Sequence, residues 1–261
     1  MSDFYENSWV RFAPDPLLTD WIAHALPAAR AAVTAPENAE WLRCGGTWFV
    51  GVNALANAAD GRVGNGPKLT GRAMDFISNE LNLPGIALDR GQISICYPGY
   101  PQRSEAESDA AFRFRRDRDA AHLDGLRAEG PERRRHLREH HGFVLGIPMV
   151  EADGDAAPLV VWEGSHEIVR EAFSKLFADL PPEEWGGLDV TDAYQAARKK
   201  VFETCRRVKV SAKPGEVYLV HRLAIHGVAP WGNKANAGPD GRMIVYFRPE
   251  LENPADWLTA P

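Results

Sequence analysis

Short runs rich in β-branched and aromatic residues, separated by Gly, Pro and Asp, fill the chain after Pro84 and constrain its fold most. Each run has the length of one strand, and turn residues close it before a helix can form. Many short strands of this kind predict a sandwich, a barrel or a jelly roll. The runs are Gly91–Tyr97, Ala120–Asp124, Gly142–Val150, Pro158–Trp162, Arg207–Ser211, Glu216–His221, Ile225–Ala229 and Arg242–Arg248.

The part of the chain before residue 86 has a mostly helical pattern. Apolar residues recur at helical spacing after Pro16, namely Leu17, Leu18, Trp21, Ile22 and Leu26. A second helix is expected over residues 69–81, one strand over 47–52, and helices inserted between the later strands over 167–179 and 191–206. No linker divides the chain, so we expect one domain over residues 1–261. Its helical part (1–85) would pack on a β core (86–250) that carries the helical insertions.

Charge and cysteine content narrow the function classes. The net charge of −6 and the pI of about 5.8 give no global electrostatic basis for binding nucleic acid or a membrane surface. The start of the chain, MSDFYENSWVRF, lacks the apolar segment of a secretory signal. The cysteines are few and odd in number, which fits a reducing compartment: Cys44, Cys96 and Cys205. We therefore expect a cytoplasmic protein, and the sequence leaves its oligomeric state open.

The first candidate for chemistry is the pair His122 and Asp124. On a strand, residues i and i+2 point to the same side, so this imidazole and this carboxylate would project together. A facial triad of two histidines and one carboxylate takes such a pair from one strand to bind Fe(II). By itself the tripeptide more often marks a solvent-facing strand end than a metal site.

The second candidate is the stretch from Lys213 to Pro230, in which two strands follow a Pro-Gly turn. It contains His221 and His226, whose spacing of five places them on opposite faces of an extended chain. One of the two is expected to be structural. We favour His226 as a metal ligand, because Gly227 follows it and allows the backbone to approach a ligand closely.

The third candidate is Arg242, which opens the last predicted strand. Alternation puts it on one face with Ile244, Tyr246 and Arg248. A guanidinium inside a barrel needs a partner, which is either an internal acid or a carboxylate ligand that it binds through two parallel hydrogen bonds.

Taken together, these pieces resemble the non-haem Fe(II)- and 2-oxoglutarate-dependent dioxygenases, in particular the phytanoyl-CoA dioxygenase-like superfamily. The order is His-x-Asp, then a turn, a strand and His-Gly, then an arginine that opens a strand. The segment Val161–His166 resembles that family's Pro-Gly-Ser-His segment, with Glu163 in place of the proline. The resemblance covers roughly Gln92 to Pro249.

The resemblance implies a mainly β fold with flanking helices and a double-stranded β-helix core, of the jelly-roll and cupin-like type. It implies His122, Asp124 and His226 as iron ligands, with Arg242 as the partner of the distal carboxylate of 2-oxoglutarate. The cofactors would be Fe(II), 2-oxoglutarate and O2. Because related halogenases have a small residue at the carboxylate position, Asp124 favours hydroxylation. The glycine- and proline-rich stretch 231–241 leaves Arg248 as an alternative to Arg242.

The implied activity is hydroxylation of a small-molecule substrate with release of succinate and CO2. Two other interpretations stay open: a cupin-like metal enzyme that does not use 2-oxoglutarate, and a non-catalytic ligand-binding barrel. Basic residues flank the His-x-Asp pair, in the segments Arg113–Arg118 and Arg133–Arg135. They are either solvated charge offset by nearby acids, or a surface that attracts an anionic substrate.

Overall fold

Two antiparallel sheets form the centre of the computed structural model, which describes residues 3–105 and 107–261. The large sheet has seven strands, in the spatial order β1 (Trp9–Phe12), β10 (Val217–His221), β7 (Phe143–Pro148), β12 (Arg242–Phe247), β4 (Gln92–Cys96), β3 (Trp48–Phe49) and β2 (Leu42–Arg43). The small sheet has the order β11 (His226–Val228), β8 (Leu159–Trp162) and β9 (Arg207–Val210). A separate hairpin joins β5 (Leu126–Glu129) to β6 (Arg134–Leu137).

The chain alternates between the two sheets, which defines a jelly roll. From β4 in the large sheet it passes the small sheet at His122 and returns to β7. It then forms β8 and β9 in the small sheet, β10 in the large sheet, β11 in the small sheet and β12 in the large sheet. The expected fold class, a mainly β protein with flanking helices and a double-stranded β-helix core, is confirmed.

Strand β12 shows how the sheet divides the core into two parts. Its residues alternate as the sequence predicts, and all six are buried. Ile244 and Tyr246 belong to the cluster between the sheets, together with Leu159 of β8. Met243, Val245 and Phe247 point the other way, into the cluster that also holds Trp21 and Ile77.

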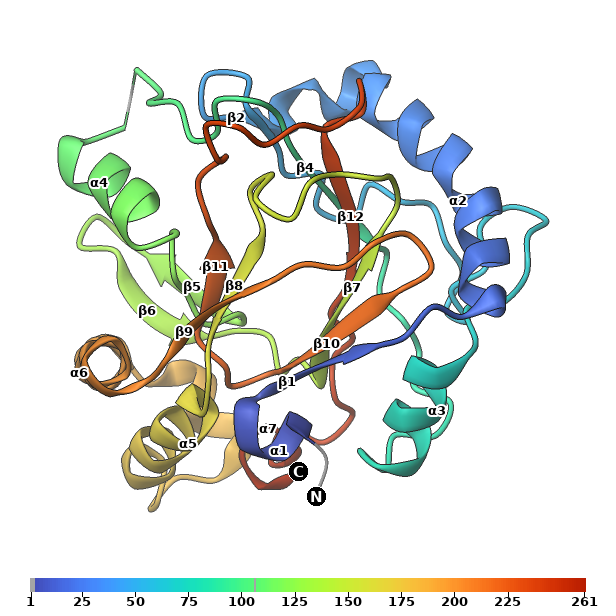
Figure 1. The fold of residues 1–261 in the computed structure, drawn as a ribbon. Coiled ribbons are helices and arrows are strands. Elements are labelled where there is room, and N and C mark those ends of the chain that lie inside the picture. Colours follow the sequence, from blue (N-terminus) through green and yellow to red (C-terminus); the bar gives the residue numbers. More distant parts are fainter. Residues whose placement is uncertain (1–2, 106) are drawn as a thin grey trace.

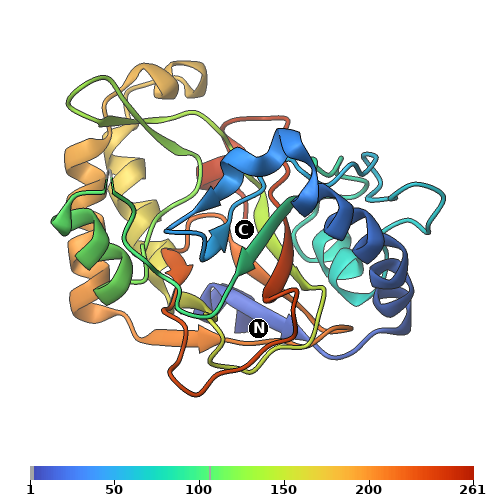
Figure 2. The same ribbon diagram turned by 90° about the horizontal axis from the view of Figure 1, so that it is seen from above.

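Helices cover the outer faces of both sheets. On one side α2 (Pro16–Thr34) and α3 (Arg72–Asn79) lie beside the large sheet, and on the opposite side α5 (Ser165–Leu176) and α6 (Thr191–Thr204) lie beside the small one (Figures 1 and 2). The shorter elements are α1 (Asp3–Asn7), α4 (Asp109–Asp117), α7 (Asp256–Thr259) and the 3₁₀ helices η1 (Pro36–Trp41) and η2 (Pro182–Gly187). Among the described helices, none is both long and apolar enough to cross a bilayer.

The N-terminal part supplies three strands, where the sequence predicted one over residues 47–52. It contributes β1 to one edge of the large sheet and β2 and β3 to the other. Strand β1 pairs with β10, from the far end of the chain, in the register Trp9 to Val220. This four-residue strand gives no clear local signal, because its pairing partner determines that it is extended.

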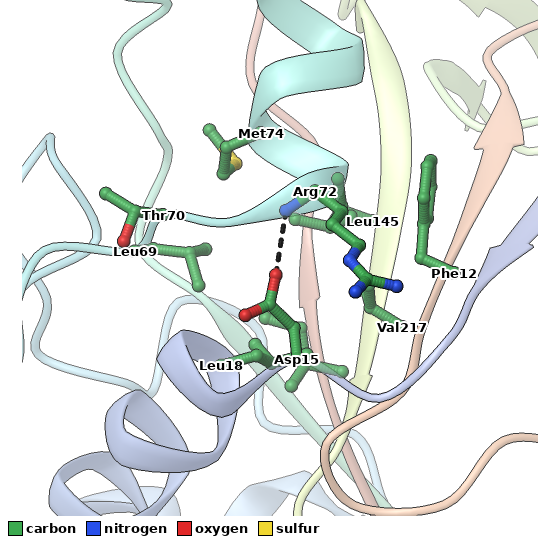
Figure 3. A pocket seen from close by; sticks show the side chains of 11 residues that line it. Phe12, Asp15, Leu18, Leu69, Thr70, Arg72, Met74, Leu145 and Val217 are labelled. Carbon is green, nitrogen blue, oxygen red and sulfur yellow. Dashed lines mark hydrogen bonds between the residues drawn. The ribbon is translucent and has the colours of Figure 1, made fainter.

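Asp15 fixes helix α2 to helix α3. One carboxylate oxygen of Asp15 accepts the Leu17 N–H at the start of α2, at 3.0 Å, and the other accepts the Arg72 N–H at 2.9 Å. Figure 3 shows this contact beside a pocket of about 10 Å³. The pocket holds about one water molecule at most, so it is not a candidate binding site. Gly71 is required there, because its φ is +107° and a Cβ would lie 2.5 Å from the Asp15 carboxylate.

Replacing Asp15 by Ala is predicted to lower the free energy of unfolding at neutral pH by about 2 kcal/mol, since both helix N-termini lose a hydrogen bond. The Arg72 N–H bond lowers the pKa of Asp15, and burial opposes this shift only in part. Asp15 therefore stabilises the fold above its unfolded pKa, about 4, and loses this effect as the pH falls through the lower folded value.

Urea unfolding at neutral and acid pH checks this prediction. The control is Asp20→Ala, which removes an exposed carboxylate of the same helix and is expected to change stability by less than about 0.5 kcal/mol. Equal losses in the two variants, or a difference that persists in acid, would contradict the role assigned to Asp15.

Candidate metal centre

Three side chains from two distant parts of the sequence meet at the edge of the small sheet. His122 and Asp124 lie between α4 and β5, and His226 opens β11. One ligand atom from each residue lies within 4.8 Å of the other two. The distance from His122 Nε2 to Asp124 Oδ1 is 3.2 Å, and that from His226 Nε2 to Asp124 Oδ2 is 3.6 Å.

The backbone holds the two histidines directly opposite each other. His122 N–H donates to the His226 carbonyl at 2.8 Å, and His226 N–H donates to the His122 carbonyl at 3.1 Å. This reciprocal pair is an isolated antiparallel bridge, so the expected strand 120–124 is reduced to one paired residue. Its ladder ends there because Asp119 and Ala120 have φ values of +56° and +51°, which turn the chain away from an extended path.

Two glycines next to the site residues allow neighbouring backbone segments to approach closely. Gly227 follows His226, and a Cβ there would lie 2.2 Å from the Asp119 carbonyl oxygen. Gly125 follows Asp124 with a φ of +84°, and a Cβ there would lie 2.2 Å from the Glu139 carbonyl oxygen. At Gly227 the group that approaches closely is therefore backbone of the same chain.

Hydrogen bonds at Nδ1 orient both imidazoles. His122 Nδ1 lies 3.0 Å from the Ala120 carbonyl, and His226 Nδ1 lies 3.0 Å from the Ala224 carbonyl. A carbonyl only accepts, so each Nδ1 carries the proton, and in a neutral ring each Nε2 presents a lone pair. Both lone pairs face the negatively charged Asp124 carboxylate. A cation bound between these three groups would stabilise this arrangement.

Asp124 is a buried carboxylate that stays ionised. Its side chain is 8% exposed. Burial raises the pKa of Asp124, but the positive charge of Arg248 and the contact with His226 outweigh burial and hold it well below its usual value. Arg248 Nη1 lies 3.6 Å from Asp124 Oδ2. The site therefore offers two imidazole nitrogens and one carboxylate, which is the donor set of a facial triad.

A cavity of about 230 Å³ opens beside these three residues. Its wall is mostly apolar, and Asp124 and Arg248 are the charged residues among those that line it, apart from the two histidines. Trp48, Gln92 and Ser94 in this wall were not expected from the sequence, whereas Tyr246 lies on the strand face where alternation placed it with Arg242 and Arg248. A sequence signal for this part of the wall is the alternation in β4, where the polar residues Gln92 and Ser94 alternate with the buried residues Ile93 and Ile95.

Arg242 lies deeper than the cavity and contacts it through Tyr246. Its Nη2 donates to the Tyr246 hydroxyl at 3.4 Å, and that hydroxyl lies 2.8 Å from the hydroxyl of Tyr218. The Tyr218 ring fits there because it crosses Gly146, where a Cβ would lie 2.1 Å from the ring. Arg242 Nη1 is buried and has no hydrogen-bond partner among the described residues. A buried guanidinium with a free N–H is suited to an anionic ligand.

His221 lies apart from the metal centre. It is 1% exposed, its Nδ1 accepts the Leu223 N–H at 2.9 Å, and its Nε2 lies 3.0 Å from Arg170 Nη2. Burial, followed by the charge of Arg222, holds the pKa of His221 well below its usual value. It is therefore a neutral core residue.

The basic segments also lie apart from the cavity lining. Arg115 pairs with Glu107, and Arg116 pairs with Asp117. Arg118 stacks over the Phe202 ring at 5.2 Å, and Arg134 pairs with Asp189. The charge of these arginines is offset locally by acids and aromatic faces.

Comparisons with known proteins give matches among solved structures alone. No protein-family model matches the chain, and no curated protein matches it. AviO1 from Streptomyces viridochromogenes Tue57 is similar over 99% of this chain and 94% of its own, at 15% identity and a TM-score of 0.44. EctD from S. alaskensis with bound Fe is similar over 95% of this chain and 74% of its own, at 16% identity and a TM-score of 0.49.

A third similar structure is the non-heme alpha ketoglutarate dependent epimerase SnoN from nogalamycin biosynthesis. The similarity covers 94% of this chain and 78% of SnoN, at 12% identity and a TM-score of 0.44. At these identities and scores, function has to be argued from the residues of the chain itself.

Gly227→Ala is predicted to separate the chain segment 119–122 from β11, because the added Cβ meets the Asp119 carbonyl. We expect a loss of about 2 kcal/mol or more in the free energy of unfolding, and a loss of divalent-metal binding measured by calorimetry. Gly238→Ala is the control, since a Cβ at Gly238 meets nothing within 4 Å. Wild-type metal affinity in Gly227→Ala would contradict the account of how the histidines are held.

Proposed function

We propose that the protein is a non-haem Fe(II)- and 2-oxoglutarate-dependent dioxygenase that hydroxylates a small-molecule substrate. The observation that carries this proposal is the convergence of two imidazole Nε2 atoms and one ionised carboxylate within 4.8 Å beside a cavity. Both Nδ1 atoms are bound to backbone carbonyls, so the lone pairs are directed before any metal arrives.

The residues fit iron and its cosubstrate. His122, Asp124 and His226 would hold Fe(II), and three protein ligands leave coordination positions for other molecules. Arg242 would hold the distal carboxylate of 2-oxoglutarate, since its Nη1 lacks a partner among the described residues and two tyrosine hydroxyls lie nearby. A metal enzyme that does not use the keto acid would have no use for this buried cation.

When bound, the iron supplies oxygen activation: O2 and 2-oxoglutarate give succinate and CO2, and one oxygen atom enters a substrate C–H bond. The chain provides the surroundings for this reaction. The carbonyls of Ala120 and Ala224 keep the imidazoles in one orientation. The apolar side chains of Val144, Leu159 and Val228 limit water in the cavity.

Three further proposals concern the domain organisation, the cellular location and the size of the substrate. The chain would act as one domain, because the N-terminal part supplies strands to the sheet that carries Arg242. A cytoplasmic location is supported by the unpaired state of Cys44, Cys96 and Cys205. The cavity is suited to a small molecule and not to a polymer, given its volume of about 230 Å³.

The metal ligands are tested by adding Fe(II) and 2-oxoglutarate without oxygen. The wild-type protein is predicted to give a weak visible charge-transfer band, which His122→Ala, Asp124→Ala and His226→Ala each abolish. His24→Ala removes an exposed histidine and is expected to keep the band. A colourless wild-type mixture with no heat of binding would contradict the proposed function.

Arg242→Gln is predicted to raise the dissociation constant of 2-oxoglutarate, titrated through the same band, by about tenfold or more, which is the effect of one lost charge-assisted bond. Fe(II) binding without the keto acid should remain, because Arg242 is not among the three ligands. The matched control is Arg11→Gln, in an exposed residue of the same sheet. An unchanged affinity in Arg242→Gln would favour a metal enzyme that does not use 2-oxoglutarate.

A further inference from the structure

Arg248 is a second guanidinium on the strand face that carries Arg242, and it lies at the metal centre itself. It follows directly after β12 and lines the cavity together with His122, Asp124 and His226. Its side chain is 20% exposed. Its Nε is buried and has no hydrogen-bond partner among the described residues.

We infer that Arg248 binds an anionic group of the primary substrate and thereby orients that substrate beside the metal centre. This inference rests on the proposed function, which it extends by naming the substrate class. The group is a monoanionic oxyanion, such as a carboxylate, a sulfonate or a phosphate diester, on a small and otherwise largely apolar molecule.

The charges around the cavity support an anionic substrate. Fe(II) brings two positive charges, and Asp124 and 2-oxoglutarate together bring three negative ones. The guanidinium of Arg242 balances that sum, so within this set of charges Arg248 leaves one positive charge without a counterpart. Asp89 lies beside Arg248, but burial raises the pKa of Asp89 and so disfavours its charged form, although the charge of Arg248 acts in the opposite direction. An uncompensated buried charge is costly, and a substrate with one negative charge removes that cost.

The present partners of Arg248 leave its guanidinium available. Its ion pair with Asp124, at 3.6 Å, is longer than a hydrogen bond, and this carboxylate is the one that would coordinate the metal. Asp89 is the other acid beside Arg248, but it accepts the backbone N–H of Arg248, at 2.7 Å. Within the described residues, no ion pair of 4.0 Å or less joins Asp89 to the guanidinium.

The two arginines start from different places along the strand. They are six positions apart, so their Cα atoms lie about 20 Å apart at roughly 3.3 Å per residue. Arg242 is buried behind Tyr246, whereas Arg248 lies on the cavity wall next to Asp124. One guanidinium is therefore available for the cosubstrate and the other for the substrate.

The apolar wall defines the rest of the substrate. Around Arg248 and the metal ligands the cavity is lined by Trp48, Val50, Val52, Val144, Leu159 and Val228. A molecule with one anionic end and a short apolar body would pair its charge with Arg248 and bury its body against these side chains.

The test measures binding of matched probes to the protein loaded with Fe(II) and 2-oxoglutarate without oxygen. The probes are butanoate, hexanoate and benzoate, each compared with its neutral amide. Hexanesulfonate tests a second kind of monoanion, and hexyl phosphate, which is mostly a dianion at neutral pH, tests the preferred charge. Calorimetry and the change in the charge-transfer band report binding. We expect at least one anion to bind wild type about tenfold or more tightly than its neutral counterpart.

In Arg248→Gln this preference for the anion should disappear, while the affinities for 2-oxoglutarate and the amides are kept in the iron-loaded protein. Arg248→Lys should keep part of the preference, because the charge remains but the planar donor geometry is lost. Arg11→Gln should behave as wild type. Urea unfolding of each variant separates a loss of binding from a loss of fold.

The outcomes separate this inference from the proposed function. If no anion binds wild type better than its amide, or if Arg248→Gln keeps the preference, the inference is wrong while the dioxygenase proposal stands. If Arg248→Gln instead loses affinity for 2-oxoglutarate, Arg248 is a cosubstrate residue and the inference is also overturned. If wild type gives no charge-transfer band at all, the proposed function itself fails.

Discussion

The reciprocal backbone hydrogen bonds between His122 and His226 are the contact on which the metal centre depends. They fix two imidazoles opposite each other, with ring centroids 4.7 Å apart, before any ion is present. The contact exists because Gly227 lets the carbonyl of Asp119 approach β11. Asp119 is in turn held by Arg207 of β9 through two bonds of 2.7 Å. The small sheet therefore positions one side of the centre through its backbone, which leaves the side chains free for chemistry.

The large sheet supplies the opposite side of the cavity. Strand β12 buries Met243, Val245 and Phe247 against the helices, and this packing anchors the strand. The same alternation turns Arg242, Tyr246 and Arg248 inward, so a rigid element presents two cations and a hydroxyl at fixed intervals. Charged groups this deeply buried are costly without partners. Arg248 lines the mostly apolar cavity and Arg242 lies behind Tyr246, and these two cations are the strongest physical argument for anionic ligands.

Much of this arrangement could be predicted from the sequence, because period-two alternation and turn residues are local signals. They give the strands from β4 onward except the hairpin of β5 and β6, which was not expected. They also give the shared direction of His122 and Asp124. The left-handed turn at Asp119 and Ala120 could not be predicted, since neither residue type requires a positive φ. The pairing of β1 with β10 and the place of Trp48 in the cavity depend on contacts between distant segments. The same limit applies to Arg242 and Arg248, whose different depths follow from the position of Tyr246.

We propose that His122, Asp124 and His226 share one ferrous ion and that Arg242 binds the keto acid beside it. The sharpest test is a crystal structure of the protein grown without oxygen with Fe(II) and 2-oxoglutarate, with anomalous scattering recorded at the iron edge. We expect one iron peak in contact with both Nε2 atoms and the Asp124 carboxylate, and a 2-oxoglutarate molecule whose distal carboxylate contacts Arg242. An iron peak elsewhere, or a keto acid bound away from Arg242, would contradict it.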